Sequence, residues 1–167
     1  KFVHNSDYES TNNMYSASLA IPELNTSENV VSINADCIYE DKIFAYLKEA
    51  KESTIFTDNS FFDEESMKVK IENGCVVGMS KLFANSSNTL VSIDLYFFKY
   101  DDFNKLASIF NTYLKNRDLI QWTEVAINDL VNKNKSMIKN TNIENSKWYE
   151  IDTIEDLSKA REKWKKI

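Results

Sequence analysis

The feature that most constrains this sequence is a short aromatic run that ends on a carboxylate and continues at once into a helical pattern. Residues 148–153 read Trp-Tyr-Glu-Ile-Asp-Thr, which is typical of a β-strand that ends near Asp152. Thr153 is suited to cap the helix that follows, and Asp156 stands three residues later, in the capping-box position. In open α/β sheets, ligands bind at the edge where the carboxyl ends of the strands lie. Asp152 is therefore predicted to lie at a ligand-binding edge.

A second apolar strand with an acid at its end occurs earlier in the chain. Residues 30–36 read Val-Val-Ser-Ile-Asn-Ala-Asp. Carboxylates that are brought together repel, and Mg²⁺ relieves this repulsion while it keeps coordination positions open for phosphate oxygens. We therefore predict that Asp36 and Asp152 form one Mg²⁺ site. Glu150 lies on the same strand face as Asp152 and is either a helper at that site or an acid at the edge of the core.

The periodicity of the remaining sequence predicts one α/β domain over residues 1–167, a length that suits a single domain. Residues 40–51 form an amphipathic pattern between the strand to Asp36 and a strand at 54–57, which is the βαβ rhythm. Residues 67–72 and 75–80 alternate around Asn73-Gly74, a strong hairpin signal. We expect a mixed, mostly parallel central sheet with flanking helices and an antiparallel hairpin excursion. The other predicted elements are a strand over residues 1–4, a helix over 14–21, a strand over 90–100, helices over 101–114 and 123–132, and a loop over 133–146 with a short strand around Met137 and Ile138.

Composition excludes several classes of function. The sequence has 20 basic and 26 acidic residues, a net charge of −6, and its basic residues cluster only at the C-terminus. We therefore expect no nucleic-acid partner. No apolar run reaches membrane-spanning length, and two isolated cysteines are typical of reduced thiols in a cytoplasmic protein. With only two glycines, the chain has no glycine-rich phosphate loop. Because it also begins abruptly, we expect it to be the C-terminal majority of a longer, here N-terminally truncated, domain.

Two pairs of aromatic and acidic residues suggest a site for a cation. Asp94 interrupts an otherwise apolar strand, and Tyr96 lies on the same face by its spacing. Trp122 and Glu124 form a similar pair at the start of a predicted helix. Aromatic faces together with carboxylates bind ammonium groups through cation–π attraction and charge pairing. The same four side chains also suit core packing, or hydrogen bonds to the hydroxyls of a neutral sugar phosphate.

One ordered set of segments covers nearly the whole chain. It consists of Asn5, Tyr8, residues 11–13, Ser16, residues 33–36, residues 65–69, Lys81, residues 92–97, residues 122–124 and residues 148–153. This order resembles the bacterial nucleotidyltransferases of the sugar-nucleotide and choline-phosphate cytidylyltransferase type, and it implies a nucleotide-diphospho-sugar transferase-like fold. The most specific parts of the resemblance are the strand to Asp36 and residues 148–153. The Gly-rich, Arg-containing loop with which that family holds the triphosphate is not present in this sequence.

The resemblance implies a Mg²⁺-dependent transfer of a nucleoside monophosphate from a nucleoside triphosphate, expected to be CTP, to a phosphorylated small molecule such as phosphocholine. Pyrophosphate would be released. The attacking phosphate is already anionic at neutral pH, so the reaction requires no protein general base. Without the phosphate loop, we expect this chain alone to be inactive. Two alternatives stay open, a sugar-1-phosphate nucleotidyltransferase with the same metal site and a non-catalytic domain that binds a metabolite or a partner chain.

The resemblance also assigns roles to single residues. Lys81 matches a family lysine and is either a contact for the acceptor phosphate or a solvated surface lysine. Asp36 would serve the nucleotide as well as the metal. Asn12, Asn13 and Ser16 match a nucleotide-binding segment, although their position at a helix start also suits capping.

Overall fold

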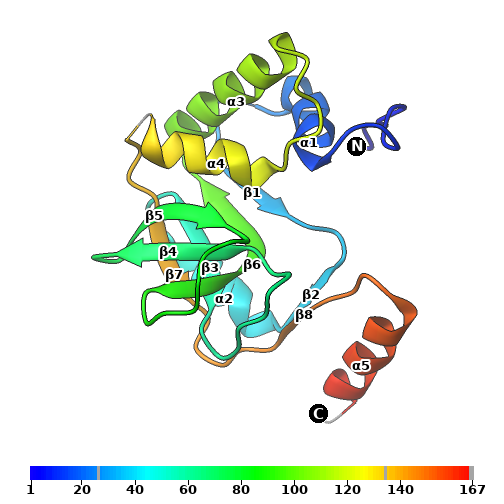
Figure 1. Ribbon diagram of the computed structural model, residues 1–167, viewed down its shortest axis with the longest axis vertical. Coiled ribbons are helices and arrows are strands. Elements are labelled where there is room, and N and C mark those ends of the chain that lie inside the picture. The colour runs from blue at the N-terminus through cyan, green and yellow to red at the C-terminus, as the bar shows by residue number, and fades with distance from the viewer. Residues whose placement is uncertain (26, 134, 166–167) are drawn as a thin grey trace.

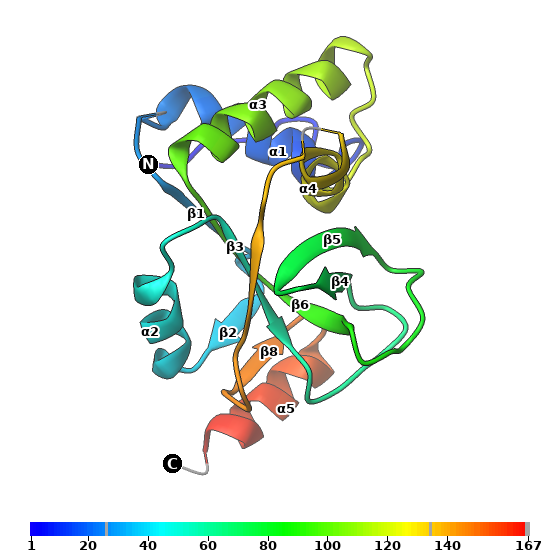
Figure 2. The same cartoon turned by 90° about the vertical axis from the view of Figure 1, so that its left-hand side faces the viewer.

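The computed structural model describes residues 1–25, 27–133 and 135–165. Its helices are α1 (Asn13–Ala20), α2 (Asp41–Glu49), α3 (Tyr100–Lys115), α4 (Thr123–Asn132) and α5 (Ile154–Trp164), with a 3₁₀ turn η1 (Ile21–Glu23) after α1. Its strands are β1 (Val30–Ile33), β2 (Cys37–Tyr39), β3 (Thr54–Asp58), β4 (Lys68–Glu72), β5 (Cys75–Ser80), β6 (Thr89–Phe98), β7 (Lys139–Asn142) and β8 (Trp148–Glu150). The helices α1, α3 and α4 gather at one end of the molecule, and α5 lies at the other (Figures 1 and 2).

The central sheet is mixed, as expected, but the expectation of a mostly parallel sheet was wrong. Its strand order is β1-β6-β3-β7-β5-β4, and β4 also pairs with β6. Among the described pairings only β3 and β7 run parallel. The reason is connection length: the two-residue turn at 73–74 joins β4 to β5 as antiparallel neighbours, and after residues 81–88 the chain returns as β6 to pair antiparallel with β4. A parallel pair needs a long crossover, and the chain supplies one between β3 and β7.

Two hydrophobic clusters hold the sheet to its helices. One packs Phe103 of α3 against Phe98 of β6, together with apolar side chains of α1 and α4. The other joins Ile43 of α2 to Leu95 of β6 and Trp148 of β8. Strand β6 supplies both clusters because successive side chains of a strand point to opposite faces. Each fully buried Leu, Ile or Phe side chain contributes about 1.5–3 kcal/mol to folding. Trp148 packs among such side chains, so the first residue of β8 is held in the core.

A small second sheet joins two distant segments of the chain. Strands β2 and β8 pair antiparallel, with Cys37 opposite Glu150. The pairing continues one step further, because the Ile151 amide donates to the carbonyl oxygen of Asp36 at 2.8 Å. Residues that are more than 110 positions apart are thereby placed side by side, which brings the two acidic segments predicted from the sequence together.

Several local predictions hold, and two elements differ. The hairpin forms around Asn73 and Gly74, whose φ angles of 50° and 72° are those of a left-handed turn. Residues 1–4 form no strand, since they have no neighbouring strand to bond, and Phe2 is fully exposed. The strand expected around Met137 and Ile138 begins directly after them, at Lys139, where β3 offers a partner to this polar segment. Residue 134 of the predicted loop lies outside the described residues.

Asp36 also differs from its expected place. Strand β1 ends at Ile33, and Asp36 follows in a turn directly before β2. The turn forms because the chain must leave β6, the partner of β1, to reach β8.

None of the helices in residues 1–25, 27–133 and 135–165 combines the length and apolar character that crossing a bilayer requires.

Candidate active site

A cavity of about 850 Å³ opens where the ends of β3 and β8, the turn before β2, the middle of β6 and the start of α4 meet. This volume is typical of sites for small molecules. All residues singled out from the sequence line it except Ser16 and Tyr96; they are Asn12, Asn13, Asp36, Lys81, Asp94, Trp122, Glu124, Glu150 and Asp152. The fold therefore gathers side chains from most of the chain's length around one space.

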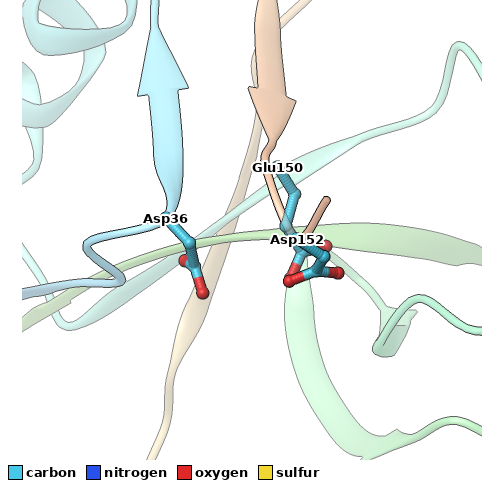
Figure 3. Close-up of side chains that lie close together, drawn as sticks. All are labelled: Asp36, Glu150 and Asp152. Carbon is cyan, nitrogen blue, oxygen red and sulfur yellow. The ribbon is translucent and has the colours of Figure 1, made fainter. Parts of the chain in front are cut away.

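Three carboxylates form one wall of this cavity. Asp36, Glu150 and Asp152 each offer an oxygen atom, and these atoms all lie within 4.8 Å of one another (Figure 3). The pairing of β2 with β8 brings them together, with Asp36 ahead of one strand and the other two at the end of its partner. Asp36 and Asp152 are exposed, whereas Glu150 is half-buried. Carboxylate oxygens so close together are the donors that a hard divalent cation prefers, so the residues present fit Mg²⁺.

The electrostatics of Glu150 reflect this crowding. Burial raises its pKa to about 7, and the negative charges of Asp94, Asp152 and Asp36 add to the rise. The positive charge of Lys81 acts in the opposite direction, which places its ammonium group within electrostatic reach of the wall. Because the unbound wall carries excess negative charge, a cation would relieve the repulsion.

The segments on both sides of Glu150 and Asp152 are held by specific bonds. The predicted capping box forms: the Asp156 amide donates to the Thr153 hydroxyl at 3.1 Å, and the Thr153 amide donates to the Asp156 carboxylate at 3.0 Å. This cap fixes the direction in which the chain leaves Asp152. At the other end of β8, the Trp148 indole donates to Asp58 at 2.8 Å.

Asp58 is a residue that the sequence reasoning missed. It is buried at the end of β3, lines the cavity and holds the indole of Trp148, whose ring also packs on Phe61 with centroids 5.8 Å apart. The signal was present, since Asp58 ends an apolar strand in the same way as the acids at Asp36 and Asp152. The loop that follows β3 was given no role either, although residues 65–69 belong to the segments that carry the resemblance. Its cavity-lining residues are Ser60, Phe61, Asp63, Glu65, Ser66 and Met67, and Asn34 joins them from the turn after β1.

A second wall of the cavity contains the buried Glu124 and the half-buried Asp94, which share one hydroxyl group. The Tyr96 hydroxyl lies 2.8 Å from Asp94 Oδ1 and 2.9 Å from Glu124 Oε1. Asp94 has a φ of 55° and lies opposite an irregularity in the β3–β6 pairing, so the strand bulges at this point and the carboxylate turns toward the cavity. Tyr96 itself is buried behind the two acids and supports them without lining the cavity.

One hydroxyl hydrogen cannot satisfy two carboxylates at once. Burial raises the pKa of Asp94 and the pKa of Glu124, and for Glu124 the charge of Asp94 is the next cause. Burial also holds the pKa of Tyr96 well above its ordinary value, so the phenol keeps its proton. This wall therefore favours a positively charged group, which would compensate both carboxylates.

Trp122 and Lys81 border the same wall. Trp122 is 42% exposed, directly before α4, and the Lys81 ammonium nitrogen lies 5.2 Å from the centroid of its ring. The backbone of Lys81 is held from below, because the buried Lys68 ammonium donates to the Lys81 carbonyl oxygen at 3.0 Å and also to the Glu64 carbonyl oxygen. Lys68 thus links Lys81 to the loop after β3.

The residues matched to a nucleotide-binding segment have structural bonds of their own. Asn12 caps α1 by accepting from the Asn13 amide at 2.7 Å. The Asn13 side-chain oxygen accepts from the Thr123 amide at 2.8 Å and so ties α1 to the start of α4. Ser16 accepts from the Asn5 side chain at 2.9 Å, away from the cavity. Asn12 and Asn13 remain at the rim of the cavity, and Ser16 does not.

Comparison with known proteins places this geometry in a fold. The sequence matches no described protein family and no curated protein. Among solved structures, 96% of the chain superposes on the inositol-1-phosphate CTP transferase from T. maritima, with a TM-score of 0.75 and 20% identity. The CTP:phosphocholine cytidylyltransferase from Streptococcus pneumoniae also matches over 96% of the chain, with a TM-score of 0.74 and 21% identity. The chain has a nucleotidyltransferase fold.

The match extends to enzymes named for sugar phosphates. A putative glucose-1-phosphate thymidylyltransferase from Bacillus anthracis matches over 91% of the chain, with a TM-score of 0.67 and 17% identity. The chain spans 63%, 67% and 60% of the lengths of these three structures. The resemblance noted in the sequence is therefore supported at the level of the fold, for cytidylyl and sugar-phosphate types alike.

Proposed function

We propose that this chain forms most of a nucleotidyltransferase that transfers CMP from CTP to a phosphorylated small molecule with a cationic headgroup. The observation that carries the proposal is the composition of one cavity, which has three carboxylates on one wall and, on a second, the buried Glu124 and half-buried Asp94 beside an exposed tryptophan. The first wall suits a metal ion and phosphates, and the second suits an ammonium group. Two of the structures with this fold are named for CTP, and one of these is named for phosphocholine.

In this proposal Asp36, Glu150 and Asp152 would hold Mg²⁺. The bound ion would neutralise negative charge on the phosphates and polarise the phosphoryl group. Asp36 serves the nucleotide through this site. Asn12 and Asn13 border the cavity and are assigned to the nucleotide side, whereas Ser16 lies outside the cavity and is not.

The chemical step requires alignment and charge compensation from the chain. An oxygen of the acceptor's phosphate forms a bond to the α-phosphorus of CTP, and the bond from that phosphorus to the oxygen that bridges it to the β-phosphorus breaks. Pyrophosphate leaves with the electron pair of the broken bond. No proton has to be removed from the attacking phosphate, and the described residues that line the cavity include no histidine. Lys81, which lies within electrostatic reach of Glu150, supplies positive charge to the acceptor phosphate.

Headgroup recognition falls to Asp94, Glu124 and Trp122. The buried Glu124 and the half-buried Asp94 share the Tyr96 hydroxyl, and Asp94 also accepts from the Ser92 hydroxyl. These donors are neutral, so the negative charge of the pair is left for a ligand to neutralise. An ammonium group offsets the desolvation of buried carboxylates better than a sugar hydroxyl does. A sugar 1-phosphate is the second candidate acceptor, because the fold also occurs in a structure named as a putative glucose-1-phosphate thymidylyltransferase.

A panel of acceptors tests the proposal. The complete natural protein is incubated with CTP, Mg²⁺ and one of phosphocholine, phosphoethanolamine, inositol 1-phosphate or glucose 1-phosphate, and pyrophosphate release is measured. We expect the two cationic acceptors to give the highest kcat/KM. Glu124→Gln should raise the KM for phosphocholine with little change in the KM for CTP, whereas the control Glu65→Gln, at an exposed acid of the same cavity, should change neither. A neutral sugar phosphate that outperforms both cationic acceptors would overturn the headgroup assignment.

A further inference from the structure

We propose that Lys81 is an internal stand-in for the cation of the acceptor. Its ammonium group occupies the face of Trp122 when the site is empty, and it leaves that face when the acceptor's own ammonium group arrives. The inference rests on the proposed function in one respect, namely that the acceptor carries a cationic headgroup. It adds a rule of selection, because it explains how the site distinguishes a phosphorylated acceptor from the same cation without a phosphate.

The first observation is the position of the ammonium group. Lys81 Nζ lies 5.2 Å from the centroid of the Trp122 ring, inside the distance of about 6 Å at which cation–π attraction acts. Across residues 1–25, 27–133 and 135–165, no carboxylate forms an ion pair with Lys81. The ring is thus the partner of this cation. The structure itself shows that the exposed face of Trp122 accepts an ammonium group.

The second observation is that this contact can be exchanged without moving the backbone. The Lys81 carbonyl is fixed by the buried Lys68, so only the side chain has to rotate. Lys81 and Trp122 border the main cavity and also a second cavity of about 490 Å³, so open space adjoins the contact. An exposed cation–π contact changes a binding constant by only about two- to five-fold, which makes it easy to displace.

The third observation concerns where the displaced ammonium group goes. Lys81 and Glu150 line the same main cavity, so the acidic wall, where the acceptor phosphate would meet the nucleotide, borders the space into which the side chain can rotate. An acceptor with both an ammonium group and a phosphate takes the ring and offers Lys81 a new anionic partner. A cation without a phosphate displaces Lys81 from the Trp122 ring and provides no new anionic partner for its ammonium group. The exchange therefore favours the phosphorylated acceptor twice, once through the new contact and once because Lys81 is not left without a partner.

Opposite responses to two ligands test this inference. Binding of choline and of phosphocholine is measured by calorimetry, without nucleotide, for the wild type and for Lys81→Met. The substitution removes the competing cation, so choline should bind about two- to five-fold more tightly. Phosphocholine should bind more weakly, because its phosphate loses a partner. Lys42→Met, which removes a positive charge from the exposed face of α2, should change neither affinity.

A double variant identifies the ring as the place of competition. In Lys81→Met combined with Trp122→Leu, the gain in choline affinity should disappear. Circular dichroism confirms that each variant is folded. Weaker or unchanged choline binding in Lys81→Met would overturn the inference and leave Lys81 as a simple phosphate contact. The acceptor panel separately tests the proposed reaction, so an inactive enzyme with the expected opposite shifts would count against the reaction and not against the exchange.

Discussion

Adding 10 mM Mg²⁺ to this protein should raise its unfolding temperature by about 3–6 °C, and Asp36→Asn should remove most of that rise. The starting point is the acidic wall, where oxygens of Asp36, Glu150 and Asp152 lie within 4.8 Å of one another. Two unit charges at that separation repel by about 0.9 kcal/mol in bulk water, and by more where the site is partly buried. The unbound wall is therefore a destabilised arrangement that a cation relieves.

The size of the shift follows from linkage. For a site with a Kd of about 1 mM, 10 mM Mg²⁺ raises the free energy of unfolding by about 1.4 kcal/mol. In a chain of this size, 1 kcal/mol corresponds to about 2–4 °C, which gives the expected shift of about 3–6 °C. If Asp36→Asn weakens the site about tenfold, the gain falls to about 0.4 kcal/mol, or about 1–2 °C. Without Mg²⁺, the same variant should be more stable than the wild type, because two of the three repulsions are relieved.

The assay is thermal unfolding followed by circular dichroism during a titration with MgCl₂, compared with NaCl at equal ionic strength. The salt series separates binding from general screening of exposed charges. Glu65→Gln is the matched control, since it removes an exposed acid of the same cavity outside the acidic wall. An equal rise in Asp36→Asn and the wild type, or an equal rise with NaCl, would refute the reasoning.

Three further predictions concern turnover, pH and nucleotide binding. In the complete protein, Asp36→Ala or Asp152→Ala should each lower turnover by orders of magnitude while the circular dichroism spectrum stays unchanged, and turnover like that of the wild type with Mg²⁺ would remove these residues from the metal site. Burial raises the pKa of Glu124, so the folded state keeps this proton to a higher pH than the unfolded chain does, and stability falls as the pH rises through that window. Glu124→Gln should therefore flatten the fall in unfolding temperature as the pH rises above the ordinary titration range of a glutamate, and an unchanged slope would argue against the raised pKa. Residues 1–167 alone contain no glycine-rich loop to hold a triphosphate, so calorimetry should find CTP affinity weaker than micromolar, and a micromolar Kd would contradict this.

Local elements follow directly from local patterns. The hairpin around Asn73-Gly74, the helix over residues 123–132 and the capping box at Thr153 all form where the sequence predicts them. Each depends on residues that are near one another in the chain, such as a left-handed turn or a side-chain cap. The direction of the strands was predicted less well, because it depends on which distant strands become neighbours.

By itself, the sequence identified the acids at positions 36 and 152, the aromatic and acidic pairs, and the family whose order of segments it resembles. Only the tertiary structure decided that Glu150 completes the acidic wall, that Tyr96 stands behind Asp94 and Glu124, and that Asp58 holds the indole of Trp148. It also placed the ammonium group of Lys81 on the ring of Trp122. The physical reason is that periodicity reports which face of an element is apolar, whereas the contacts between faces depend on strand register and packing across the whole chain.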